Sequence, residues 1–514
     1  MSLITSIILV PFLGALLVAL IPRDYRFVIR IVALAATLVS MVLAIAMFVK
    51  FDSATATNGF KFVQQIAWVP SLGINYYVGV DGINVGLILM GAIVAFAAAC
   101  VSNRIETQVK EFYLLLLVMV GGILGAFASL DLFFFYFFHE LALVPTFIMI
   151  GVWGRGEQKN YATFQITLYL SIGALIALIG LIILYINSAV GGLPATFDIV
   201  EMTRRFKTIP MAIGAQKLIF PLLFFGFGIL VSLWPFHTWA PLGYGSAPVA
   251  TAMLHAGVLK KFGLYGLIRI ALPLAPEGAR VWLHVIAWLA LGNILYCGWV
   301  AMRQRDFNSL LGNSSVTHMG FCFLGIASLS LIGITGTVLV MIAHGLLAAL
   351  SFGLSGYLNE QTGTLEISKM GGLMKKMPFI GTALIMAAMA GCGLPGFANF
   401  PGELLTLFGA WKTLSPFVVV AAWGALVVGA IYMLRAVRNI LHGPVADNLP
   451  VVSDASLWRK VPFALLLGAL LVFGIAPRLL TSKIEPAVKE IVAMTKSQSP
   501  VAGPATAQKR AEVR

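Results

Sequence analysis

The sequence predicts an all-α polytopic membrane protein of about fourteen transmembrane helices. Its composition is the first reason: 60% of the 514 residues are hydrophobic, 11% are charged, and the mean hydropathy is +0.96. Soluble globular domains carry about 25% charged residues, so this composition excludes that class. The second reason is that apolar runs of about twenty residues, the length of helix that crosses a bilayer core, recur along the chain.

These apolar runs define the expected spans, and most connections between them are short. In chain order the spans cover residues 3–21, 27–49, 80–101, 111–130, 131–152, 162–188, 217–239, 247–271, 279–301, 308–328, 330–358, 376–411, 416–441 and 460–480. No connection is long enough to predict an extramembrane domain. We therefore expect the chemistry of this protein to take place in or beside the membrane.

Two of the spans contain residues that interrupt a helix. Residues 376–411 would form a helix of about 54 Å, too long for one bilayer, and Pro395 lies in the middle within CGLPGFANFPGE. Span 217–239 ends in LWPFHTWAP, where Pro235 and Pro241 remove backbone donors. Because freed backbone groups need protein or water partners, broken helices inside a membrane indicate a transport path.

The basic residues of the loops indicate the orientation. An even number of spans places both termini on one side, and short loops on the other side carry Arg23, Arg26, Arg104, Lys110, Arg155, Lys159, Arg303, Arg305, Lys369, Lys375, Lys376, Arg435 and Arg438. The positive-inside rule makes that side cytoplasmic, so both termini are expected on the periplasmic side of a bacterial inner membrane. The net charge of +14 suits anionic lipid headgroups of the bilayer better than nucleic acid.

Ionisable residues inside the spans are the candidates for function, since a charge at mid-membrane is costly and usually lines a cavity or a proton route. Glu140 lies near the centre of span five, and Lys260 and Lys261 lie near the middle of span eight. Adjacent helical positions point about 100° apart, so we expect only one of the two lysines to face the polar interior. His237, His318 and His344 lie in or beside three other spans, and Glu403 follows the Pro395 interruption.

These side chains have one chemistry in common, which is the gain or loss of a proton. A lone histidine in an apolar helix is more often structural, but several of them alongside a glutamate and two lysines favour a proton relay. The sequence has neither a phosphate-binding loop nor a dinucleotide-binding motif, and its four cysteines show no C-x-x-C spacing. We therefore expect no metal site and no bound cofactor in this chain.

Several motifs resemble those of a known family. They are FFFYFFHELALVP with GVWG, WPFHTWAP with APVATAMLHAGVLKKFGLYGLIRI, NSSVTHMGF, and LPGFANFPGELLTLFG. Over about residues 75–445 the chain resembles the M-type antiporter-like membrane subunit of complex I, the proton-pumping NADH:quinone oxidoreductase. The resemblance implies fourteen helices, with helices seven and twelve broken. It implies these units: spans one to three (1–101), two inverted five-helix repeats (111–271 and 279–441), span fourteen (460–480) and a polar C-terminal tail (481–514).

The resemblance also implies roles for individual residues. Glu140 matches the family's fifth-span glutamate, which pairs with a lysine, and Lys261 matches the eighth-span lysine. His237 matches the histidine after the seventh-span break. His318 and His344 match histidines of the central axis, and Glu403 matches the twelfth-span acid at the expected exit.

The chain departs from the family pattern at four positions. Leu230 replaces the seventh-span lysine that would pair with Glu140, and Asn308 replaces a lysine at the start of span ten. Leu242 and Tyr244 stand where an aspartate and a histidine are usual. Lys260, which the usual pattern lacks, is our candidate for the missing partner of Glu140.

The expected function is a proton-translocating membrane-arm subunit of a complex I-like enzyme. NADH, FMN, iron–sulfur clusters and quinone would then bind to partner subunits, namely the hydrophilic arm and other membrane subunits. Three alternatives stay open: a subunit of a multisubunit cation/proton antiporter, a subunit of a membrane hydrogenase, and a pump-inactive scaffold. The lysine losses favour the last of these.

Overall fold

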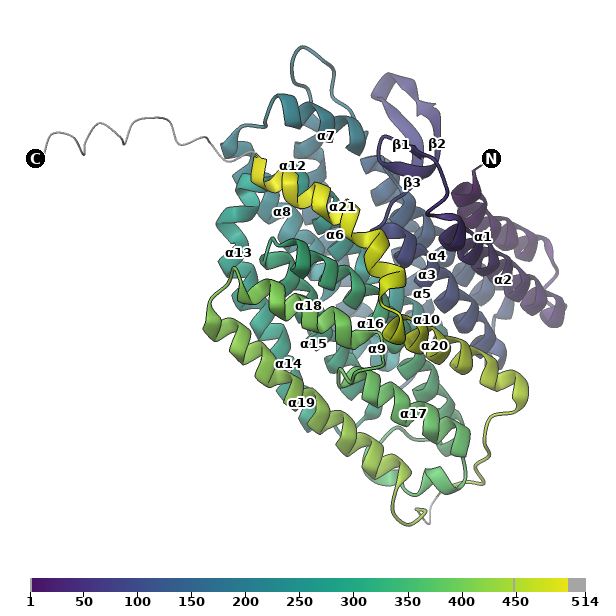
Figure 1. Cartoon of the computed structure of the whole chain (residues 1–514). Helices are drawn as coiled ribbons and strands as arrows, with labels where there is room; N and C mark the ends of the chain where they lie inside the picture. Colours follow the sequence, from purple (N-terminus) through teal and green to yellow (C-terminus); the bar gives the residue numbers. More distant parts are fainter. Residues whose placement is uncertain (1, 447–448, 498–514) are drawn as a thin grey trace, which may run out of the picture.

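The computed structural model describes residues 2–446 and 449–497, and these fold into a bundle of helices with one small sheet (Figure 1). The first half contains α1 (Leu3–Leu20), α2 (Arg26–Lys50), α3 (Asn84–Val101), α4 (Val109–Ala128), α5 (Leu132–Trp153), α6 (Lys159–Asn187), α7 (Ile199–Thr208), α8 (Ile213–Val231), α9 (Trp239–Ser246), α10 (Val249–Leu254), α11 (Lys261–Gly266) and α12 (Leu272–Leu274). The second half contains α13 (Pro276–Leu291), α14 (Cys297–Arg303), α15 (Phe307–Ala327), α16 (Leu331–Thr362), α17 (Pro378–Gly391), α18 (Asn399–Trp411), α19 (Pro416–Leu441), α20 (Leu457–Ile475) and α21 (Arg478–Ser497).

The structure confirms an integral membrane protein that is mainly helical. In the described ranges twelve helices are long and apolar enough to cross a membrane, with α13 and α14 counted as one helix. Two further apolar stretches are divided into shorter pieces. Residues 249–274 alternate between α-helical and π-helical turns, and residues 378–411 form α17 and α18 with a non-helical segment between them.

Burial separates the central helices from the peripheral ones. The most apolar part of α15 is completely buried and that of α16 is 89% buried, whereas α6 and α19 are only 39% buried. Small residues let the central helices approach closely: a Cβ on Gly336 of α16 would lie 2.6 Å from the backbone nitrogen of Thr406 on α18. Polar side chains of α15, α16 and α18 are therefore kept away from lipid.

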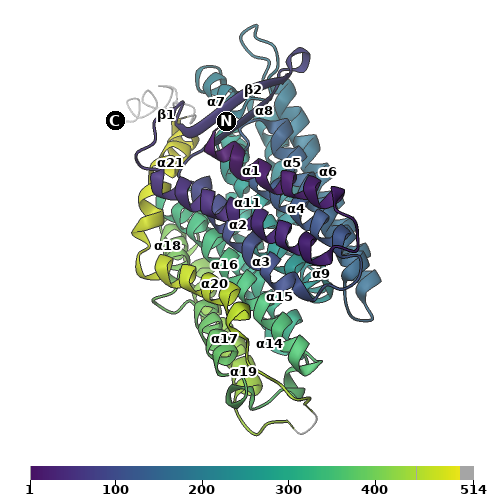
Figure 2. The same ribbon diagram turned by 90° about the vertical axis from the view of Figure 1, so that its right-hand side faces the viewer.

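The connection between α2 and α3 contains strands that the sequence analysis did not predict. It forms an antiparallel sheet of β1 (Ala56–Thr57), β2 (Phe60–Val69) and β3 (Ile74–Val80), in the order β1-β2-β3. This sheet, α7 and the N-terminus lie at one end of the bundle (Figures 1 and 2). Short runs such as YYVGV alternate too briefly to stand out beside membrane spans.

The C-terminal segment also differs from our expectation of a polar tail over 481–514. Residues up to Ser497 belong to α21, which lies across the bundle against α12 and α16 (Figure 1). Its apolar side chains include Leu480, Ile484 and Val488, which are buried, so one face of the helix packs on the protein. The rest of the predicted tail, 498–514, lies outside the described residues.

Candidate functional site

Four of the predicted residues meet in the centre of the bundle. Lys261 Nζ lies 2.8 Å from His344 Nδ1, and His318 Nδ1 lies 2.9 Å from Glu403 Oε1. The ring centroids of His344 and His318 are 5.2 Å apart. The side chains come from α11, α16, α15 and α18, and all four residues are at most 4% exposed. We call Lys261, His344, His318 and Glu403 the central row.

Local backbone geometry explains why Lys261 reaches the row. The π-helical turn His255–Leu259 precedes it, and Lys261 Nζ also donates a hydrogen bond of 2.6 Å to the carbonyl oxygen of Ala256 in that turn. Such turns are frequent at functional sites. A Cβ on Gly257 would lie only 2.9 Å from the carbonyl oxygen of Gly345, so glycine at this position lets α16 bring His344 close to the lysine.

The segment between α17 and α18 positions the other end of the row. Gly393 has φ +66°, and a Cβ there would lie 2.6 Å from Glu403 Oε2. Glycine therefore serves two purposes at this position, because it adopts the left-handed conformation and leaves room for the carboxylate. The predicted interruption near Pro395 thus lies directly against Glu403.

Lys260 points in a different direction from Lys261, but both lysines are buried against polar groups, so our expectation that only one of them faces the polar interior is wrong. The Nζ of Lys260 donates a hydrogen bond of 3.1 Å to Ser315 Oγ on α15 and lies 5.5 Å from the centroid of the Tyr244 ring. Lys260 is 1% exposed. Its surroundings are polar side chains of α9 and α15, not Glu140.

Glu140 does not join the central row, and the expectation that Lys260 replaces its missing partner is wrong in this structure. Its carboxylate lies 3.5 Å from His139 Nδ1, and its side chain is 32% exposed. It belongs to an outward stripe of α5 with Phe137 and Val144, which are 43% and 48% exposed. The apolar spacing of α5 did not predict this orientation, because both faces of the helix are apolar.

His237 is also separate from the central row. It lies in the non-helical stretch between α8 and α9, is 6% exposed, and its Nδ1 has no partner among the described residues. Asn293 satisfies the backbone of this stretch: its Oδ1 accepts a 2.7 Å hydrogen bond from Trp234 N, and its Nδ2 donates a 2.9 Å bond to Ser232 O. Our sequence analysis missed Asn293, although an asparagine inside the apolar run LGNILY was a signal.

The two positions at which the resemblance implies a lysine are filled by side chains with local contacts. Leu230 is 4% exposed and belongs to the hydrophobic core. Asn308 accepts a hydrogen bond from Ser355 of α16. Neither position provides a charge near Glu140.

A buried ion pair is a second feature that the sequence analysis missed. Arg269 Nη2 lies 2.5 Å from Asp81 Oδ2, and the two side chains are 8% and 7% exposed. Arg269 Nε also donates a 3.3 Å hydrogen bond to Tyr265 Oη. Both ion-pair residues stand in apolar sequence, GVDGIN and YGLIRI, which was the available signal.

The chemistry available in the central row is proton transfer. An amine, two imidazoles and a carboxylate each bind and release a proton, and hydrogen bonds join them in two pairs. Within the described part of the chain no three His, Cys, Asp or Glu side chains converge to hold a metal ion. The row is therefore suited to moving protons between helices.

Comparisons with known proteins show which proteins this chain resembles in sequence and fold. Residues 129–429 match the model of a family described as NADH:quinone oxidoreductase/Mrp antiporter, transmembrane. The NADH-quinone oxidoreductase subunit M of Rhodobacter capsulatus is 33% identical over 471 residues, which is 90% of each chain. The F(420)H(2) dehydrogenase subunit M of Methanosarcina mazei is 34% identical over 445 residues, covering 86% of this chain and 88% of that one. A chain of respiratory complex I from Thermus thermophilus superposes with a TM-score of 0.86 at 29% identity, covering 96% of this chain and 99% of the other.

Proposed function

This chain belongs to the NADH:quinone oxidoreductase/Mrp antiporter transmembrane family, and we propose that it is the proton-translocating M-type subunit in the membrane arm of a complex I-like enzyme. The observation that carries the proposal is the central row. It places a lysine, two histidines and a glutamate in sequence through the buried core. Relatives named as subunits of oxidoreductases support the assignment to such a complex.

In this proposal protons move along the row from Lys261 towards Glu403. Lys261 gives a proton to His344 through their 2.8 Å contact, and His318 passes one to Glu403 through theirs. Between the two imidazoles, with centroids 5.2 Å apart, a water molecule or a small ring rotation completes the transfer. The carboxylate releases its proton towards the segment between α17 and α18.

The finer architecture is part of the proposal. Residues 249–274 form span eight, while α8 with α9 and α17 with α18 form the broken spans seven and twelve, which makes fourteen. Spans four to eight (111–271) and nine to thirteen (279–441) are the two inverted repeats. Both termini lie on the periplasmic side of a bacterial inner membrane, and the redox cofactors NADH, FMN, iron–sulfur clusters and quinone belong to partner subunits.

The outward position of Glu140 supports a neighbouring membrane subunit at α5. The Glu140 side chain is 32% exposed, and a carboxylate that is partly open to lipid is costly, so a partner that supplies a hydrogen-bond donor would stabilise this face. The surrounding exposed side chains, such as Phe137 and Val144, suit a helix–helix contact in the membrane.

A second candidate is a scaffold that assembles like the pumping subunits but conducts no protons. The buried Leu230 favours it, because the family's usual lysine at that position is lost. The central row argues against it, since four ionisable side chains buried together are costly and usually retained for function.

The test is a His344→Leu variant of the whole complex, reconstituted in vesicles. We expect fewer protons moved per NADH oxidised, while NADH:quinone electron transfer stays within about twofold. His284→Leu on α13 is the matched control, because His284 lies outside the row on an exposed position. Unchanged proton yield with His344→Leu would reject the central row as a route and favour the scaffold.

A further inference from the structure

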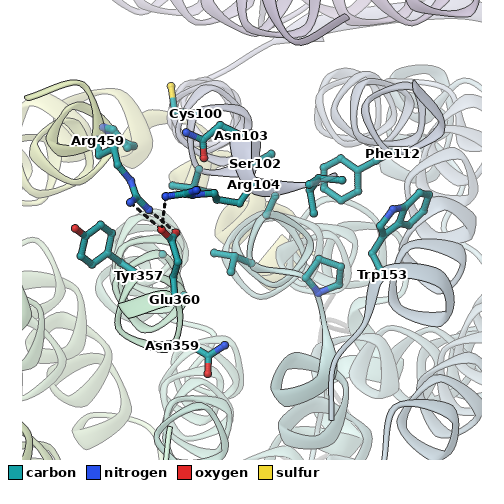
Figure 3. Close-up of a pocket in the computed structure, with 18 of the residues that line it drawn as sticks. Cys100, Ser102, Asn103, Arg104, Phe112, Trp153, Tyr357, Asn359, Glu360 and Arg459 are labelled. Atoms are coloured by element: carbon teal, nitrogen blue, oxygen red, sulfur yellow. Dashed lines mark hydrogen bonds and ion pairs between the residues drawn. The ribbon is translucent and has the colours of Figure 1, made fainter. Parts of the chain in front are cut away.

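A cavity of about 220 Å³ lies at the end of the bundle opposite the β-sheet, beside the ends of α3 and α16 and the starts of α10 and α20 (Figure 3). Its volume is smaller than the roughly 300–1,000 Å³ of pockets that enclose a drug-sized ligand. The cavity can therefore hold the polar end of a larger molecule while the rest of that molecule stays outside. No residue of the central row lines it.

The charged residues of the cavity wall are three arginines and one glutamate. Arg104 follows α3, Arg155 lies between α5 and α6, and Arg459 is in the first turn of α20. Glu360 of α16 is the acidic residue among them. Guanidinium groups stay charged in proteins, and one carboxylate balances only one of the three. The wall therefore carries an excess of positive charge, which favours an anionic ligand.

The contacts of Glu360 leave guanidinium donors available. Arg459 Nη1 donates to Glu360 Oε1 at 2.9 Å, and its Nη2 donates to Oε2 (Figure 3). Arg104 reaches the same carboxylate through its Nη2, which lies 3.0 Å from Oε1. Arg155 is held by a 3.4 Å hydrogen bond from its Nε to the carbonyl oxygen of Gly245. Since a guanidinium group has five N–H donors, Arg104 and Arg155 can each bind a further acceptor.

Aromatic residues place the cavity at the level of the lipid headgroups. Trp458 at the start of α20 is 84% exposed, and tryptophan and tyrosine are enriched at the membrane–water interface. Trp153 lines the cavity. Tyr357 lines it too, and its ring centroid lies 4.4 Å from the guanidinium carbon of Arg459. The arginines are thus positioned where the phosphate groups of a bilayer lie.

The cavity wall is apolar one helical turn further into the membrane spans. On α20, Phe463 follows Arg459 by one turn and lines the cavity. At the end of α3, Cys100 lines it one turn before Arg104. Val461 of α20 is 38% exposed, so apolar surface that is open to the bilayer begins beside the cavity. Acyl chains would cover this surface, whereas a free phosphate compound would leave it uncovered.

We propose that this cavity binds the phosphate headgroup of an anionic phospholipid from the leaflet on the side opposite the termini. Arg104 and Arg155 donate to the phosphate oxygens, and the acyl chains lie along α20. The forked donors of a guanidinium group match phosphate oxygens, and basic pockets between membrane helices bind anionic headgroups. The site is separate from the central row, so this inference goes beyond the proposed function and holds whether or not the chain moves protons.

The test is photo-crosslinking of the whole complex in nanodiscs. The probes are phosphatidylglycerol and phosphatidylcholine, each with a diazirine at the start of one acyl chain. We expect phosphatidylglycerol to label peptides that cover residues 97–106 and 455–465 about fivefold more than phosphatidylcholine does, which is the effect of one basic residue near an anionic surface. Peptides that contain Val427, an exposed position of α19, should be labelled equally by both lipids.

A charge variant tests the arginines. Arg104→Gln should lower the labelling by phosphatidylglycerol about fivefold, while Glu360 keeps its contact with Arg459. Arg438→Gln is the matched control, because it removes the same charge from an exposed position of α19 outside the cavity, on the same side of the membrane. An equal loss with both variants would reveal a general effect of surface charge and overturn the site.

Two further outcomes would also overturn the proposal. One is equal labelling of the site by the two lipids in the wild type, a comparison that needs no variant to assemble. The other is displacement of phosphatidylglycerol by millimolar glycerol 3-phosphate, which would identify a soluble phosphate compound as the ligand. We expect no displacement, because glycerol 3-phosphate has no acyl chains to cover the apolar surface beside Val461.

Discussion

Replacing Asp81 by asparagine should strongly destabilise the junction between the start of α3 and the π-helical turn Leu267–Ala271. The substitution keeps an oxygen for the backbone N–H groups of Ile83 and Asn84, which donate to Asp81 Oδ1 at 3.0 and 3.2 Å. It removes only the charge that faces Arg269 at 2.5 Å. The guanidinium is then left buried without a counter-charge.

The size of the effect follows from that burial. Breaking a buried ion pair by removing one partner costs about 3–5 kcal/mol. A free-energy change of about 1.4 kcal/mol corresponds to a tenfold change in an equilibrium constant. The equilibrium constant for local opening should therefore rise by a factor of about 10² to 10⁴. Hydrogen exchange of the intact purified complex measures this directly, in peptides that cover residues 81–86 and 265–274.

A double variant provides the control. Asp81→Asn combined with Arg269→Met removes the pair instead of breaking it, and should recover most of the lost protection because no charge is left buried alone. If Asp81→Asn changes exchange by less than threefold, or the double variant is no better protected than the single one, the pair does not stabilise this junction.

Two further predictions concern the surface of the chain. Hydrogen bonds from Arg204, which has the larger effect, and from Arg205 lower the pKa of Glu201 to about 2. The stability that Glu201 contributes to α7 is therefore complete above about pH 4.3 and is lost as the pH falls towards 2. Hydrogen exchange of α7 should therefore differ between the wild type and Glu201→Gln at pH 6 and converge near pH 2; equal protection at pH 6 would contradict the role of the ion pairs. The second prediction concerns the face of α5 that carries Glu140, where a photo-crosslinker at Phe137 should capture another subunit in native membranes. The control is a photo-crosslinker at Val427 of α19, which is 63% exposed and should capture lipid. Capture of lipid alone at both positions would refute a subunit contact.

Part of this protein could be read from local sequence. Hydropathy located the spans because crossing a bilayer requires about twenty consecutive apolar residues of one helix, whatever the rest of the chain does. The interruption at Pro395 was visible for a similar reason, since proline removes a backbone donor locally. Charged residues in such runs, including Lys261 and Glu403, stood out against their apolar neighbours.

Which of these side chains meet was decided by the tertiary structure. Lys261 contacts His344 because a π-helical turn and the close approach of Gly257 to Gly345 bring two helices together, and neither feature follows from hydropathy. Glu140 lies on a partly exposed face of α5, and periodicity could not predict this orientation because both faces of the helix are apolar. Sequence records which residues can carry a proton, but the transfer path depends on distances between helices that lie far apart in the chain.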